Sequence, residues 1–216
     1  MFDEIIDKEK KKYDALHKMS GYEETSSGYG RQLGLVMNSD SIFFKNIRNS
    51  IKRETSVLEI GIGAGEMTQW LINCTDHSVS IDISEYAVDS VKKISGAGED
   101  RIKENSAHDL NFESCHFDVV LHLDGMEHIP HELEVLCLKE ACRVLKSGGR
   151  LYYANACCDA WWDHIMVSQG YDNVHINVKT PAQWVDFYQR NVEEFGCSLE
   201  HHEVSGDTIY VIIGKN

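Results

Sequence analysis

Two acidic residues and a histidine lie close together at Asp124, Glu127 and His128, in the run Asp-Gly-Met-Glu-His. If the chain turns helical there, their spacing of three and four residues puts them on one face. Two carboxylates and an imidazole on one face can bind a divalent cation such as Mg2+ or Mn2+. Without a metal, His128 could serve as a general base, since the reference pKa of histidine lies near neutrality.

A glycine-rich turn lies earlier in the chain, after the apolar run 57–60, with Gly61, Gly63 and Gly65 at alternate positions. Glycine lacks Cβ, so it adopts positive φ and lets a ligand approach the backbone closely. The helical pattern after the turn offers unpaired N–H groups at its start. An acid, Asp82, ends the next apolar run, where an acid commonly binds ribose hydroxyls. Together these features predict a nucleotide-cofactor site.

The order acid-x-Gly-x-Gly-x-Gly over residues 59–65 resembles motif I of the class I S-adenosylmethionine (SAM) methyltransferases. Three later segments match that family in the expected order, at 117–120, 126–129 and 143–151. The resemblance extends over roughly residues 50–155, about half of the chain. It implies that SAM is the cofactor, with its amino-acid end at the glycine turn and its ribose at Asp82.

The resemblance also implies which residues contact SAM. They are Glu59, Gly61, Gly63, Gly65, Asp82, Ile83, Ser106, Ala107 and Leu123. One position departs from the family pattern, because Ser106 stands where an Asp usually bonds the adenine amino group. Asn105 and Asp109 are the alternatives for that contact.

The acid-x-x-Glu-His run resembles ubiquinone-biosynthesis O-methyltransferases and small-RNA terminal 2′-O-methyltransferases, which bind a magnesium-type ion there. The RNA enzymes add a later histidine, and His175 lies in a similar place. The resemblance implies metal binding by Asp124, Glu127, His128 and His175, with Asp124, His128 and His175 as catalytic residues. A Glu-His pair also occurs in relatives that use no metal, so the metal-free alternative stays open. In that case His128 or His175 is the base, and His122 is a core histidine.

Strand and helix patterns alternate through the middle of the chain. Strands are expected at 56–60, 78–82, 101–105, 117–122 and 149–155, with helices at 65–73, 84–95 and 131–146. Pro181 opens a further helix to about 194, and 198–204 with 208–213 read as a β-hairpin. The expected fold is α/β and Rossmann-like: a seven-stranded, mostly parallel sheet with helices on both faces and a C-terminal antiparallel hairpin. Residues 1–50 are expected to form a helical cap, and 51–216 the methyltransferase domain.

Composition restricts the partners. The formal net charge of -14 over 216 residues makes long nucleic acid an improbable substrate, because phosphate binding depends on Lys and Arg. No apolar run approaches the roughly 20 residues that span a membrane. Seven cysteines, an odd number without paired CxxC spacing, suit a reducing cytoplasm. We therefore expect a cytoplasmic enzyme, monomeric or homodimeric, that acts on a small molecule.

The preferred hypothesis is methyl transfer to a hydroxyl group, with or without divalent-metal assistance. The alternatives are metal-free N-methylation of a small amine or amino sugar, transfer of another group from a SAM-like cofactor, and SAM binding without catalysis. Two aromatic segments are further candidates. Trp161 and Trp162 could floor a substrate pocket, and Tyr22, Tyr29 and Arg31 could cover SAM.

Overall fold

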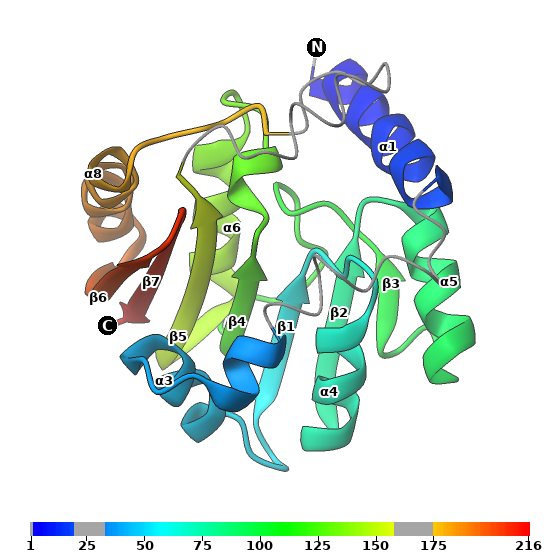
Figure 1. Ribbon diagram of the computed structural model, residues 1–216, viewed down its shortest axis with the longest axis horizontal. Helices are drawn as coiled ribbons and strands as arrows, with labels where there is room; N and C mark the ends of the chain where they lie inside the picture. The colour runs from blue at the N-terminus through cyan, green and yellow to red at the C-terminus, as the bar shows by residue number, and fades with distance from the viewer. Residues whose placement is uncertain (1, 20–32, 158–174) are drawn as a thin grey trace. The chain divides into compact units, whose positions relative to one another are not determined.

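The computed structural model describes residues 2–19, 33–157 and 175–216 (Figure 1). The chain divides into two compact units, residues 1–107 and 108–216. In the part of the chain that the structure describes, no helix has both the length and the apolar character needed to cross a membrane.

The first unit holds three parallel strands in the order β3-β2-β1. Its elements along the chain are α1 (Phe2–Met19), α3 (Ile42–Ser50), β1 (Ser56–Ile60), α4 (Glu66–Cys74), β2 (His77–Asp82), α5 (Glu85–Ser95) and β3 (Ile102–Glu104). Residues 57–60 of β1 are all buried, the pattern of a parallel strand covered on both faces. Leu58 pairs with Val79, so the ends of β1 and β2 reach the glycine turn and Asp82 together.

The N-terminal helix α1 is attached to the start of α5 within this unit (Figure 1). Ser84 is the N-cap of α5, and its hydroxyl donates to Asp14 Oδ1 at 2.6 Å. The backbone N–H of Tyr86 donates to the same oxygen at 3.2 Å. Because a helix N-terminus has unpaired N–H groups and favours negative charge, Asp14 acts as a second cap from a distant helix.

The second unit holds four strands in the order β4-β5-β7-β6. Its elements are β4 (Phe117–Leu123), η1 (Met126–His128), α6 (Glu134–Val144), β5 (Leu145–Ala156), α8 (Pro181–Val192), η2 (Glu193–Phe195), β6 (Cys197–Ser205) and β7 (Thr208–Lys215). β4 and β5 are parallel, whereas β7 pairs antiparallel with both β5 and β6. Gly206, with φ 62°, makes the tight turn of the hairpin.

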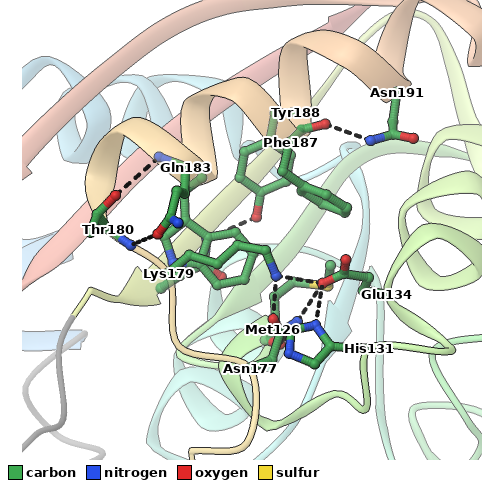
Figure 2. Close-up of polar contacts among 12 residues, drawn as sticks. Met126, His131, Glu134, Asn177, Lys179, Thr180, Gln183, Phe187, Tyr188 and Asn191 are labelled. Atoms are coloured by element: carbon green, nitrogen blue, oxygen red, sulfur yellow. Dashed lines mark hydrogen bonds and ion pairs between the residues drawn. The ribbon is translucent and has the colours of Figure 1, made fainter.

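Helix α8 begins where its cap residues predict. Thr180 accepts a hydrogen bond from the backbone of Gln183, and the Gln183 side chain accepts one from the backbone of Thr180 (Figure 2). Pro181 takes the first helical position, where its missing N–H costs nothing. The buried face of α8 carries Trp184, and Trp184 Nε1 donates to Ala156 O at 3.2 Å. This bond fixes α8 against the end of β5.

The Rossmann-like α/β class is confirmed: the described residues form a sheet of seven strands, mostly parallel, with helices around it and a C-terminal antiparallel hairpin. The bounds of β5 differ from the expected ones, because the strand begins at Leu145 and not at residue 149. Leu145 already pairs with Phe117, and the pairing shifts register before Arg150. Gly148, with φ 77°, accommodates this irregularity. The sequence had suggested that a helix continues to residue 146, where the strand has already begun.

Candidate active site

The glycine turn, residues 61–65, is held by backbone hydrogen bonds in the first unit. Gly61 N donates to Ile81 O at 2.8 Å, and Gly65 N donates to Ile62 O at 2.8 Å. All three glycines have positive φ: 82° at Gly61, 49° at Gly63 and 88° at Gly65. Residues other than glycine rarely adopt this backbone conformation, which explains why glycine occupies each of the three positions.

Two of these glycines are required for different reasons. A Cβ on Gly65 would lie 2.7 Å from Val91 Cγ2 of α5, so Gly65 permits the close packing of this turn on the next helix. A Cβ on Gly61 would have no atom within 4 Å among the described residues. The backbone at Gly61 is therefore open to a ligand, while Gly65 holds the turn in place.

Asp82 ends β2 and supports the same turn. Its Oδ2 accepts from Ile62 N at 3.0 Å, and its Oδ1 accepts from Ser84 N at 2.9 Å. The side chain is nearly buried, and this burial raises the pKa of the Asp82 carboxyl, while the charge of His17 on α1 opposes the rise. Burial in turn lowers the pKa of His17. Asp82 thus lies under α1 and links the turn to the start of α5.

The remaining SAM contacts expected in this unit occupy mixed environments. Glu59 is buried in β1, and its Oε2 accepts from Thr68 Oγ1 of α4 at 2.7 Å. Burial raises the pKa of Glu59 to about 7. Ile83, Ser106 and Ala107 are half-buried and follow the ends of β2 and β3. Glu59 therefore ties β1 to α4, whereas the other three are more accessible.

In the second unit the structure brings together Glu127, His128 and His175, here called the carboxylate–imidazole cluster. One ligand atom from each lies within 4.8 Å of the others. The two imidazole rings have centroids 4.8 Å apart and planes inclined by 48°. One carboxylate and two imidazoles at these distances form a donor set that could hold a metal ion.

The Glu127 carboxyl is fixed on one side only. Its Oε1 accepts from Ala156 N, at the end of β5, at 3.0 Å. Its Oε2 is buried and has no hydrogen-bond partner among the described residues. Burial first, and then the charge of Asp124, raise the pKa of Glu127 to about 8. A buried oxygen without a partner is costly, and a bound cation would satisfy it.

Asp124 does not belong to this cluster, within the described residues. Its φ is 53°, in the left-handed region, and the short helix η1 begins only at Met126. The expectation of one helical turn over 124–128 is therefore wrong, and the three-and-four spacing does not place Asp124 on the face of Glu127 and His128. Asp124 N instead donates to Ala154 O at 2.8 Å, directly after the last residue pair between β4 and β5.

The bend after β4 is shaped by His122. A Cβ on Gly125 would lie 2.1 Å from His122 Nε2, so the ring fills the space beside this glycine. His122 is buried, and burial lowers its pKa to about 4. Its packing agrees with the core role expected for it. Leu123, the last residue of β4, is half-buried.

The family described as "Methyltransferase domain" matches residues 58–153. This span includes the glycine turn, Asp82, Glu127 and His128. Residues 58–153 form a SAM-dependent methyltransferase domain. Among curated proteins, none matches this chain.

The similarity to solved structures covers more of the chain than the family match does. The DhpI complex with S-adenosylhomocysteine (SAH) has a TM-score of 0.69 at 16% identity, over 97% of this chain and 96% of that one. A protein from Pyrococcus horikoshii OT3 has a TM-score of 0.64 at 18% identity, over 89% and 93%. A putative methyltransferase from Bacillus halodurans C-125 has a TM-score of 0.59 at 22% identity, over 77% and 72%. At these identities the likeness is one of fold.

SAM would bind at the glycine turn of this domain. The open backbone at Gly61 would accept the amino-acid end of SAM, and Asp82 would accept hydrogen bonds from the ribose hydroxyls. SAM supplies an electrophilic methyl group when it is bound. The residues of this chain supply the close approach and the hydrogen-bond acceptors.

Sequence reasoning missed residues that fix these groups. Asp14 reaches the start of α5 from α1, and Asn177 is buried beside η1. Neither forms a local motif with its partner. The helix N-cap predicted at Thr180 could have directed attention to Asn177, because the N-cap fixes where the segment that contains Asn177 meets α8. The aromatic candidates Tyr22, Tyr29, Trp161 and Trp162, together with Arg31, lie outside the described residues.

Proposed function

We propose that this methyltransferase transfers the SAM methyl group to a hydroxyl of a small molecule, and that a divalent ion held by the carboxylate–imidazole cluster assists the transfer. The observation that carries the proposal is the convergence of Glu127, His128 and His175 within 4.8 Å. The buried Glu127 Oε2, which lacks a hydrogen bond among the described residues, supports it further.

The chemistry of the donors favours some ions over others. Oxygen-rich sites suit Mg2+, whereas imidazole suits first-row transition metals. With two imidazoles and one carboxylate, the cluster fits Mn2+ better than Mg2+. Asp124, which would have added a second carboxylate, is not in the cluster.

Each group has a role in the proposed reaction. A bound ion lowers the pKa of a coordinated hydroxyl. Glu127, fixed by the N–H of Ala156, contributes a carboxylate oxygen that cannot turn away. His128 and His175 contribute nitrogen donors from separate segments of the chain. These residues orient the acceptor oxygen, and orientation accounts for a large part of the rate enhancement in such transfers.

Metal-free methylation of a small amine or amino sugar is the second candidate. The formal net charge of -14 favours it, because an acidic protein attracts cationic substrates. In that reaction His128 or His175 would accept the proton released by the amine. The same excess of acid weighs against a long polyanionic acceptor.

A calorimetric titration of Mn2+ into chelator-stripped protein, saturated with SAH, tests the metal role. The test variant is His175→Ala, and the matched control is His77→Ala, which removes an exposed histidine at the start of β2. We expect one ion per chain in the wild type and in the control, and loss of that binding in His175→Ala. Absence of binding in the wild type would contradict the metal role and favour the amine reaction.

A further inference from the structure

The segment 175–180 is attached to η1 by backbone hydrogen bonds. Ile176 N and Asn177 N both donate to Glu127 O, each at 3.0 Å. These bonds bring the chain around His175 against the same residue whose carboxyl belongs to the cluster. The position of His175 therefore depends on how firmly the following residues are held.

Asn177 is fully buried and is held through both atoms of its amide group. Its Nδ2 donates to Glu134 Oε2 at 2.6 Å and to Met126 O at 3.3 Å. Its Oδ1 accepts a hydrogen bond from Lys179 Nζ. Figure 2 shows Asn177, Lys179 and Glu134 converging beside Met126 of η1. The amide thus has a donor side and an acceptor side, and only one orientation satisfies both.

Lys179 neutralises the carboxylate that Asn177 needs. Its Nζ lies 2.6 Å from Glu134 Oε2, with both side chains largely buried. The ammonium group also lies 4.6 Å from the centre of the Trp184 ring and 5.3 Å from that of Phe187. A cation that lies over aromatic faces and is paired with a buried carboxylate has a restricted position. The aromatic face of α8 therefore fixes the charge pair, and the charge pair fixes Asn177.

We propose that Glu134, Asn177 and Lys179 form a positioning network that holds His175 beside Glu127 and His128. Its consequence for ion binding rests on the function proposed above. Its hydrogen bonds join the three side chains to one another and to Met126 O. It acts through the backbone of 176–177, and residues that orient ligands in this way commonly control metal affinity.

The substitution Asn177→Asp tests the network with almost no change in size. It replaces the donor Nδ2 with an oxygen that faces Glu134 Oε2 and Met126 O, so attraction becomes repulsion. The matched control is Asn191→Asp on α8, where Asn191 Nδ2 donates within the same helix to Phe187 O at 2.7 Å (Figure 2). Lys179→Met serves as a second test variant, because it removes the cation and leaves Asn177 intact.

Two measurements decide the proposal. Amide hydrogen exchange followed by NMR should be faster by about 10-fold or more at Ile176 and Asn177 in Asn177→Asp and in Lys179→Met, and unchanged in Asn191→Asp. In calorimetry with Mn2+ and SAH, the same two variants should weaken Mn2+ binding by about 10- to 100-fold, while SAH affinity stays at the wild-type value.

Unchanged exchange at Ile176 and Asn177 in both test variants would overturn the network. Faster exchange with unaltered Mn2+ affinity would also overturn it, because the network would then hold the segment without positioning His175. If the wild type binds no Mn2+, the proposed ion site is wrong. Hydrogen exchange at the Ile176 and Asn177 amides then tests by itself whether the network holds this segment.

Discussion

The glycine turn and the carboxylate–imidazole cluster are built in opposite ways. The glycine turn comes from one stretch of chain, in which backbone bonds and positive φ angles produce the geometry. The cluster joins η1 to His175, far along the chain, and depends on side chains such as Asn177 that fix one segment on another. The turn would offer a ligand its backbone, whereas the cluster would offer side-chain atoms.

This contrast predicts where each region tolerates change. A region built from backbone fails when a side chain is added, and a region built from side chains fails when one is removed. Damage to the turn should therefore reduce stability and cofactor affinity, while damage to the cluster should reduce turnover and leave SAM binding intact.

The largest effect is expected for His128→Ala in the cluster. We expect turnover to fall by about 10²- to 10⁴-fold, because His128 would hold the ion in the proposed reaction and would take the proton in the metal-free alternative. SAH affinity should remain at the wild-type value. Transfer of labelled methyl from SAM to an acceptor found by screening hydroxyl compounds measures the first quantity, and calorimetry with SAH measures the second. Parallel losses in both would make His128 structural and remove the contrast.

Gly65→Val adds a side chain to the turn. The new Cβ would meet Val91 at 2.7 Å, at a φ of 88° that valine does not tolerate. Overpacking and backbone strain together should lower the free energy of unfolding by about 3 kcal/mol. Gly148→Val is the control, since φ is 77° there but nothing lies within 4 Å among the described residues. Urea unfolding that gives equal losses for the two variants would show that packing on α5 is unimportant.

Asp82→Asn tests the contribution of one carboxylate to the backbone-built region. The amide replaces one acceptor oxygen by a donor, next to the N–H groups of Ile62 and Ser84. SAH binding measured by calorimetry should weaken by about 1–3 kcal/mol, the cost of unpaired hydrogen-bonding groups. Asp89→Asn, at an exposed position of α5, provides the control. An unchanged Kd for Asp82→Asn would place the ribose elsewhere.

The smallest effect concerns pH and Glu59. Burial raises its pKa to about 7 in the folded protein, above the value near 4.3 of an exposed glutamate. The folded protein therefore binds the Glu59 proton more tightly than the unfolded chain does. The resulting contribution to the free energy of unfolding is fully present below the unfolded pKa and is lost as pH rises through about 7. Between pH 5 and 7 the loss should be about 2 kcal/mol at most.

Glu59→Gln should remove that part of the pH dependence, since Gln can still accept from Thr68 but does not titrate. Urea unfolding at pH 5 and pH 7 measures it, with the exposed Glu113→Gln as control. A slope in Glu59→Gln equal to that of the wild type would mean that Glu59 does not contribute to the pH dependence of stability.

The same contrast explains what the sequence could predict. β1 was predicted at 56–60 and is found at Ser56–Ile60, because a continuous apolar run before glycines has few alternatives. The helical turn at Asp124 was suggested by spacing alone, whereas Asp124 has a left-handed φ and the His122 ring lies beside Gly125. Glu134 and Lys179 were missed because their partners are distant in sequence, and no local pattern records such a contact.

The cap that Asp14 places on α5 has a consequence for protein engineering. Removing residues 2–19, as in trimming an N-terminus for crystallisation, would take away the acceptor of the Ser84 hydroxyl and the Tyr86 amide. The helix that follows Asp82 would then begin with fewer of its amides paired. Poor SAM binding by a shortened protein would follow from the loss of α1, which carries both Asp14 and His17, and would not by itself point to a defect in the glycine turn.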